Sequence, residues 1–130
     1  MQDAQKHILL VDDDSYIREM VSEHLQRQGY CVDAASSGPE ALTLAAKVPD
    51  LILLDLGLPG MTGLEVVKKL KENEATSHIP FIVFSNSAEA EDHKNAVELG
   101  AAGFMIKAQS TPEEILACLA TYFSHHTPVA

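Results

Sequence analysis

The chain has 130 residues, enough for one domain with a single hydrophobic core. Its formal net charge of −10 repels the phosphates of nucleic acids and anionic membranes, which argues against direct binding to either. No apolar run approaches the ~20 residues that span a bilayer, and no signal peptide begins the chain, so we expect a cytoplasmic protein. Cys31 and Cys118 lie far apart, outside any metal-binding spacing, and we interpret them as reduced core thiols.

Strand and helix patterns alternate along the chain. Apolar runs predict five strands, at 7–11, 30–35, 51–54, 81–84 and 103–106. Apolar residues at helical spacing predict a helix after each strand, at 15–28, 38–47, 63–72, 89–99 and 112–124. Capping residues mark four of the helix starts: Asp14 or Ser15, Ser37 with Glu40, Thr62 with Glu65, and Thr111 with Glu114.

This alternation is typical of an α/β domain in which helices cover both faces of a parallel sheet. We predict a flavodoxin-like (βα)5 three-layer sandwich with a five-stranded sheet in the order 2-1-3-4-5. The domain is expected to occupy residues 7–124, between tails at 1–6 and 125–130. The partly alternating strand at 30–35 fits an edge position, and the helix at 89–99 has few apolar residues to anchor it.

Polar residues follow the strands at the points where the strands end. Asp12 and Asp13 follow the first strand, Asp55 follows the third, Ser85 ends the fourth, and Lys107 follows the fifth. Each has an ordinary explanation by itself, as a helix cap, a turn residue or a solvated surface group. Because the carboxyl ends of parallel strands meet at one edge of the sheet, we expect all five to lie together, where ligand crevices form.

The chemistry of these five side chains is consistent with a metal and a phosphoryl group. Three neighbouring carboxylates repel one another, and this raises their pKa values unless a cation is present. Oxygen ligands without histidine or cysteine favour Mg²⁺ over Ca²⁺ or Zn²⁺. The Ser85 hydroxyl and the Lys107 ammonium suit phosphoryl oxygens.

Two segments carry a resemblance to a known family. HILLVDDD at 7–14 and DLGLPGMTG at 55–63 resemble the acidic-pair and phosphoacceptor segments of response-regulator receiver domains, the family of the bacterial chemotaxis regulator. Ser85 matches the hydroxyl position of that family, Lys107 its lysine, and Phe104 its switch aromatic residue. The resemblance covers about residues 7–124.

The resemblance implies a phosphoacceptor domain of a two-component phosphorelay rather than an enzyme with its own substrate. A histidine kinase or histidine phosphotransfer protein would donate the phosphoryl group to Asp55. Mg²⁺ would be held by Asp12 or Asp13, by Asp55 and by the backbone carbonyl of Gly57. Lys107 would bind one phosphoryl oxygen, and catalysis would be mainly positioning and charge stabilisation.

The same resemblance implies a switch. Ser85 would move to bind a second phosphoryl oxygen, and Phe104 would rotate inward behind it. The helix at 89–99, the strand at 103–106 and the last helix would then present a changed face. A downstream protein partner, an effector domain or a second copy of the chain, in a phosphorylation-dependent homodimer, would read that change.

Two positions depart from the family pattern. The family usually has proline after the lysine, often with a cis peptide bond, whereas this chain has Ala108. We therefore predict a trans bond and a differently shaped loop, because a cis bond without proline costs ~3 kcal/mol. Asn86 stands where the family usually has a small residue, and we expect it to alter access to Asp55.

Two other functions compete with this interpretation. The chain could be a degenerate receiver that acts only as a protein-interaction module, although the complete set of polar residues argues against it. A Mg²⁺-dependent aspartyl-phosphate phosphatase would need a second carboxylate two residues after Asp55, and that position is Gly57. No effector follows Ser124, so we expect either a stand-alone receiver or a piece of a longer protein.

Overall fold

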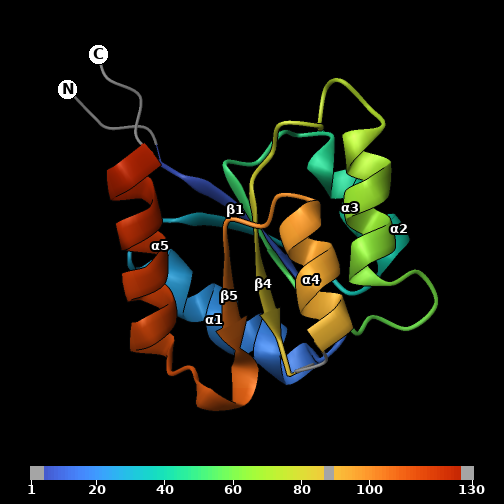
Figure 1. Cartoon of the computed structure of the whole chain (residues 1–130). Coiled ribbons are helices and arrows are strands. Elements are labelled where there is room, and N and C mark those ends of the chain that lie inside the picture. The colour runs from blue at the N-terminus through green and yellow to red at the C-terminus, as the bar shows by residue number, and fades with distance from the viewer. Residues whose placement is uncertain (1–4, 87–89, 127–130) are drawn as a thin grey trace.

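The computed structural model, which describes residues 5–86 and 90–126, contains a five-stranded parallel sheet in the order β2-β1-β3-β4-β5 (Figure 1). Its strands are β1 (His7–Val11), β2 (Cys31–Ala35), β3 (Leu51–Leu54), β4 (Phe81–Ser85) and β5 (Gly103–Ile106). Its helices are α1 (Ser15–Arg27), α2 (Gly38–Ala45), α3 (Gly63–Lys71), α4 (Ala90–Glu98) and α5 (Pro112–His126), with a 3-10 turn η1 at Lys107–Gln109. The predicted fold and strand order are confirmed.

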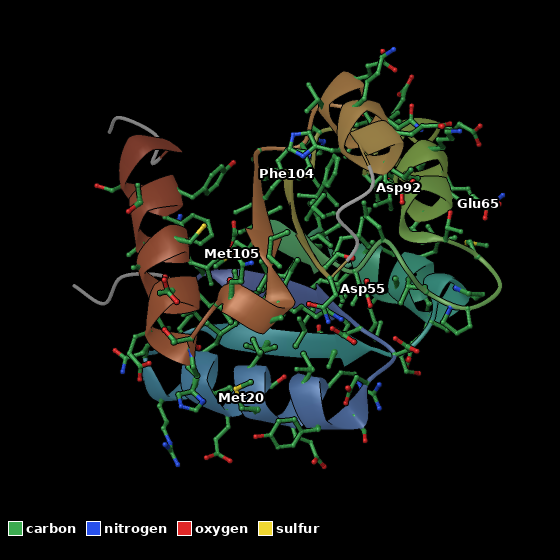
Figure 2. All side chains as sticks on the ribbon, turned by 60° about the horizontal axis from the view of Figure 1, so that its bottom comes forward. Met20, Asp55, Glu65, Asp92, Phe104 and Met105 are labelled. Carbon is green, nitrogen blue, oxygen red and sulfur yellow. The ribbon has the colours of Figure 1, made fainter. Side chains whose placement is uncertain are left out.

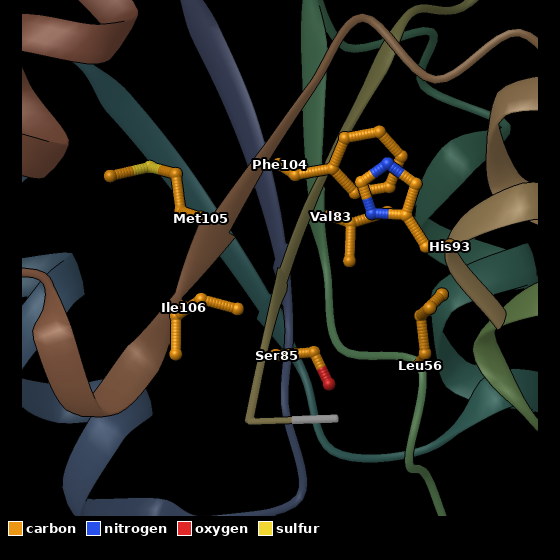
Figure 3. A pocket seen from close by; sticks show the side chains of 7 residues that line it. All are labelled: Leu56, Val83, Ser85, His93, Phe104, Met105 and Ile106. Carbon is orange, nitrogen blue, oxygen red and sulfur yellow. The ribbon is translucent and has the colours of Figure 1, made fainter. Parts of the chain in front are cut away.

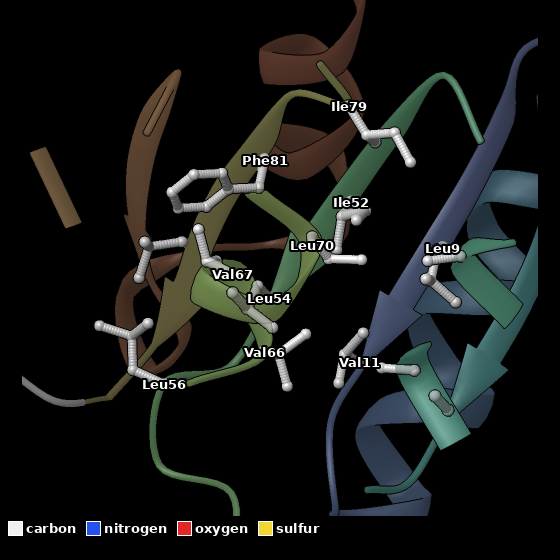
Figure 4. Close-up of a cluster of buried hydrophobic side chains, with 14 of the residues drawn as sticks. Leu9, Val11, Ile52, Leu54, Leu56, Val66, Val67, Leu70, Ile79 and Phe81 are labelled. Carbon is white, nitrogen blue, oxygen red and sulfur yellow. The ribbon is translucent and has the colours of Figure 1, made fainter. Parts of the chain in front are cut away.

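The sheet is buried on both faces, which explains why its central strands are apolar without alternation. Ile8 and Leu10 of β1 belong to a core that α1 and α5 complete. Leu9 and Val11 point to the opposite face, into a core built mainly with α2 and α3 (Figure 4). All four residues of β3 are buried. Burying an aliphatic side chain of this size contributes ~1.5–3 kcal/mol, so the two cores are the main source of stability.

The edge position predicted for the second strand is confirmed, because β2 pairs with β1 alone in the described sheet. The edge also explains an error in the prediction for the cysteines. Cys31 begins β2 and is exposed, so its assignment to the core is wrong, whereas Cys118 on α5 is half-buried. Both are free thiols.

The helix starts follow the predicted capping residues. The Asp14 side chain accepts hydrogen bonds from the backbone N–H groups of Tyr16 and Ile17 at the start of α1. Thr62 and Glu65 form a reciprocal capping box at the start of α3. Thr111 and Glu114 exchange the same two bonds before α5.

The predicted helix ends are less accurate. Helix α2 ends at Ala45, two residues early, because the next backbone bonds tighten from i→i−4 to i→i−3, as in Lys47 N–H to the Leu44 carbonyl. Helix α5 continues to His126, two residues beyond Ser124. Helix α4 begins at Ala90, and the predicted first residue, Glu89, lies outside the described residues.

The loop after β3 folds back tightly on the start of α3. The Gly63 N–H donates to the Leu56 carbonyl at 3.1 Å. A Cβ atom at residue 63 would overlap the Asp55 carbonyl oxygen and lie 2.8 Å from the Leu56 Cα. Glycine at 63 is therefore required for the close approach that fixes the backbone of Asp55.

We predict that Gly63→Ala lowers the free energy of unfolding by ~1–3 kcal/mol, since backbone atoms must move to admit the methyl group. Urea unfolding followed by circular dichroism measures the change. Gly103→Ala is the matched control, because its Cβ would meet nothing closer than 3.8 Å. Equal stabilities of the two variants would contradict the packing argument.

Candidate functional site

Asp55 lies at the carboxyl edge of the sheet, directly after β3, and is only 6% exposed (Figure 2). Three segments hold its carboxylate. The Gly57 N–H donates to Oδ1 at 2.9 Å, the Ser85 hydroxyl donates to the same oxygen at 3.1 Å, and the Lys107 ammonium donates to Oδ2 at 2.9 Å. The two carboxylate oxygens are thus held by different groups, from the ends of different strands.

Asp12 lies beside Asp55 and is fully buried. The Lys107 Nζ is 2.5 Å from Asp12 Oδ2, so a single ammonium group, itself 10% exposed, lies between two buried carboxylates. The other oxygen of Asp12 accepts the Asp14 N–H at 2.9 Å, and the Arg18 guanidinium donates to the Asp12 carbonyl at 2.9 Å. Two negative charges therefore share one positive partner.

The pKa values of Asp12 and Lys107 both lie above their ordinary values. Burial raises the pKa of Asp12, and the hydrogen bond from Lys107 offsets the effect only in part. For Lys107, burial lowers the pKa, but the hydrogen bonds to Asp12 and Asp55 and the negative charges of both residues together outweigh it, so the pKa lies above the ordinary value. The ammonium therefore stays charged at neutral pH, while the buried Asp12 carboxylate is less stable than one in water.

The acidic residues fit the predicted Mg²⁺ site. Oxygens of Asp12, Asp13 and Asp55 lie within 4.8 Å of one another, with Asp13 exposed at the mouth of the site. Asp12 Oδ2 is buried and contacts the Lys107 ammonium, which also binds Asp55. A hard cation bound to the carboxylate oxygens would supply the positive charge that one ammonium cannot supply to three carboxylates. For Gly57, the structure shows a hydrogen bond from its N–H to Asp55. Its carbonyl therefore stays a predicted ligand of the ion.

A cavity of about 180 Å³ lies beside Ser85, between α4 and the β4–β5 edge. It is lined by Leu56, Val83, Ser85, His93, Phe104, Met105 and Ile106 (Figure 3). The Phe104 ring stacks on the imidazole of His93 from α4, with ring centroids 4.0 Å apart and an angle of 11° between planes. The sequence indicated Phe104 but not His93, because His93 is an exposed residue on an acidic helix and belongs to no apolar periodic pattern.

Asn86 and Ala108, the two residues that depart from the family pattern, contact each other. The Asn86 side-chain oxygen accepts the Ala108 N–H at 2.9 Å. The described residues contain no cis peptide bond, so the trans bond predicted between Lys107 and Ala108 is confirmed. The amide group of Asn86 is therefore bonded to the loop after β5, which sequence analysis did not anticipate.

Comparison with known families decides the assignment. A model of the response regulator receiver domain matches residues 8–120. The chain belongs to this family. Receiver domains are the signalling modules of two-component systems, and they bind Mg²⁺ at an acidic pocket of the kind described above. None of the helices described here is long and apolar enough to cross a bilayer.

Relatives of known sequence and structure agree with the assignment. The phosphate regulon transcriptional regulatory protein PhoB of Pseudomonas aeruginosa is 38% identical over 115 residues, which cover 88% of this receiver and 50% of PhoB. The chemotaxis protein CheY4 of Vibrio cholerae superposes with a TM-score of 0.84 at 35% identity, covering 91% of this chain and 98% of CheY4. The beryllofluoride-activated DrrB receiver domain superposes with a TM-score of 0.80 at 27% identity, covering 93% and 99%.

The receiver spans about half the length of the first curated relatives it matches, at 50% of PhoB and 55% of the Bacillus subtilis protein ResD. The family membership therefore concerns the receiver domain itself. The activity of a whole protein, its output and its partners are matters for proposal.

We predict that Asp12→Asn raises the free energy of unfolding in EDTA at neutral pH, and that the gain shrinks as the pH falls. Burial raises the pKa of Asp12 in the folded state, so the folded protein keeps this proton at pH values where the unfolded chain has lost it. Wild-type stability therefore declines as the pH rises above the ordinary aspartate range, whereas the asparagine variant lacks this loss. In the variant, the Lys107 ammonium pairs with one buried carboxylate, that of Asp55, instead of two.

Urea unfolding of both proteins, from about pH 4 to about pH 7, measures the difference. Asp13→Asn is the control, because Asp13 belongs to the same cluster but is exposed. A difference that does not change with pH, or a less stable Asp12→Asn protein at pH 7, would contradict the analysis.

Proposed function

We propose that Asp55 is the phosphoacceptor of this receiver, and that a histidine kinase or histidine phosphotransfer protein supplies the phosphoryl group from phosphohistidine. The position of Asp55 is the observation that carries the proposal. It is the acidic residue that contacts both Ser85 and Lys107 and also lies within the carboxylate cluster. Family membership supports the same assignment.

The transfer requires little covalent chemistry from the protein. A carboxylate oxygen of Asp55 attacks the phosphorus, a P–O bond forms, and the P–N bond to the donor imidazole breaks. The imidazole leaves with the electron pair and takes up a proton. The three hydrogen bonds to Asp55 fix the attacking group before the donor arrives, which removes part of the entropic cost.

Asp12, Asp13, Asp55 and the Gly57 carbonyl would hold Mg²⁺. When bound, the ion supplies positive charge that offsets the carboxylates and the incoming phosphoryl oxygens. Lys107 remains charged beside Asp55 and is ready to bind a phosphoryl oxygen.

The contacts of Asp55 suggest how phosphorylation changes the surface. Ser85 and Lys107 now bind the carboxylate, and a phosphoryl group on Asp55 would attract both of them to its own oxygens. Movement of Ser85 changes the wall of the cavity that Phe104 also lines, so the ring can leave His93 and enter it. The face of α4, β5 and α5 then changes, and a downstream partner, an effector domain or a second protomer binds it.

No observation favours the two competing functions. Residue 57, where a phosphatase would place its acid–base carboxylate, contributes a backbone N–H to Asp55. A module that only binds protein would not need a buried lysine held between two carboxylates, an arrangement that is costly to build.

We predict that incubation with Mg²⁺ and acetyl phosphate adds one phosphoryl group to the wild-type protein and none to Asp55→Asn. The variant keeps the shape of the side chain but lacks the nucleophilic carboxylate. Intact-mass spectrometry measures the product. A stoichiometric, base-labile phosphate on Asp55→Asn would contradict the proposal.

Asp13→Asn separates the metal from the acceptor, because it removes an exposed ligand and leaves Asp55 unchanged. Its Mg²⁺ affinity should fall about tenfold or more, or ~1.4 kcal/mol, while saturating Mg²⁺ restores phosphorylation. Equal Mg²⁺ affinities of wild type and Asp13→Asn would show that the ion binds elsewhere.

For the switch, we predict that beryllofluoride with Mg²⁺ changes hydrogen exchange most strongly in α4 and β5. Beryllofluoride activates the DrrB receiver domain and here stands for the phosphoryl group on Asp55. His93→Ala removes the ring that stacks on Phe104 and should enlarge the beryllofluoride-bound population. Asp55→Asn, which should not respond, is the control, and changes confined to α1 and α2 would rule out the proposed face.

A further inference from the structure

We propose that Asn86 is a positioning residue, which holds Lys107 at a fixed place relative to Ser85 through the hydrogen bond from the Ala108 N–H. The proposal rests on the function proposed above, because it concerns the groups that bind the phosphoryl oxygens. Asn86 directly follows Ser85, and Ala108 directly follows Lys107. The bond therefore joins the two residues next to the two side chains that contact Asp55.

The bond extends the pairing of two strands beyond their last ladder position. The register of β4 and β5 ends with Ser85 opposite Ile106. Asn86 lies one residue beyond Ser85 and Ala108 two residues beyond Ile106, and the Asn86 side-chain oxygen accepts the Ala108 N–H at 2.9 Å. A side chain thus links the two chain segments just beyond the end of the sheet.

Within the turn after β5, the other backbone hydrogen bonds are local, and the Lys107 side chain alone reaches Asp12 and Asp55. Lys107 begins the turn η1, and the preceding residue, Ile106, provides no side-chain cap. Ser110 bonds back to the carbonyls of Ile106 and Lys107, but both bonds are local to the turn. The bond to Asn86 instead ties the turn to the end of β4.

The Asn86–Ala108 hydrogen bond can remain in place when phosphorylation of Asp55 changes the contacts of Ser85 and Lys107. The Lys107 ammonium binds Oδ2 of Asp55 at 2.9 Å and the Ser85 hydroxyl binds Oδ1 at 3.1 Å, and both must transfer to phosphoryl oxygens. The Asn86–Ala108 bond does not involve Asp55, so it can persist while they transfer. It limits how far the two donors can separate, and a 1 Å misplacement of a catalytic group can reduce a rate by about 10²-fold.

The hydrogen bond to Asn86 requires a residue with a backbone N–H at position 108. Alanine has a backbone N–H, whereas proline has none and could not bond to Asn86. Asn86 is exposed, so we expect the bond to add little to global stability. Its effect should appear in the rate of phosphorylation and in local protection of the loop.

The experiment compares Asn86→Ala, which removes the acceptor, with Asn86→Asp, which keeps an acceptor oxygen in the same position. Asn73→Ala is the matched control, because the exposed Asn73 side chain accepts the Ala75 N–H at 2.9 Å, outside the site. All proteins are assayed at saturating Mg²⁺ and acetyl phosphate, at a salt concentration that screens the charge added by aspartate.

We expect Asn86→Ala to slow phosphorylation about tenfold or more and to speed amide exchange of Ala108, measured by NMR. Asn86→Asp should restore both readouts towards wild type, and Asn73→Ala should leave them unchanged. Rescue by aspartate distinguishes positioning from a general loss of structure.

Two results would overturn the inference, and they are distinguishable. If wild type is phosphorylated on Asp55 and Asn86→Ala matches Asn73→Ala in rate and in Ala108 exchange, Asn86 has no positioning role and the proposed function stands. If wild type takes no phosphoryl group at Asp55, the proposed function fails and this inference fails with it.

Discussion

The site depends on one ammonium group between two buried carboxylates. Lys107 lies 2.5 Å from an oxygen of Asp12 and 2.9 Å from an oxygen of Asp55. Loss of this ammonium would leave both buried carboxylates without their cationic partner, and leaving a buried charge unpaired typically costs ~3–5 kcal/mol. Yet the charges do not balance, because the cluster has more carboxylates than ammonium groups and Asp13 adds another at its mouth. This excess of negative charge is what makes the site suited to Mg²⁺.

The fold assembles this cluster from residues far apart in the chain. Parallel strands buried on both faces bring their carboxyl ends to one edge, and hydrophobic burial in the two cores offsets the cost of the charges there. The groups that now hold Asp55 are the groups a phosphoryl modification would attract. Phosphorylation of Asp55 would therefore change the contacts of Ser85 directly. Ser85 lines the cavity beside the stacked rings of Phe104 and His93, so these rings would be affected in turn.

The strand order and the helix caps could be predicted from the sequence, because alternating strands and helices and the capping residues are local patterns. The proximity of Asp12, Asp55, Ser85 and Lys107 could also be predicted, because parallel strands bring their carboxyl ends to one edge of the sheet. Interactions between elements were not accessible in the same way. The stack on His93 depends on how α4 lies against β5, and the Asn86–Ala108 bond depends on how two loops pack. The exposure of Cys31 was misjudged because a cysteine in a short strand gives no sign of which face is covered.

The central claim is that Asp55, among several neighbouring carboxylates, takes the phosphoryl group. Borohydride reduction tests it most directly, since it converts an acyl phosphate of aspartate into homoserine, which peptide mass spectrometry can locate. After phosphorylation in Mg²⁺, the account predicts homoserine at position 55 and none at 12 or 13. Homoserine at Asp12 or Asp13, with Asp55 unchanged, would contradict it.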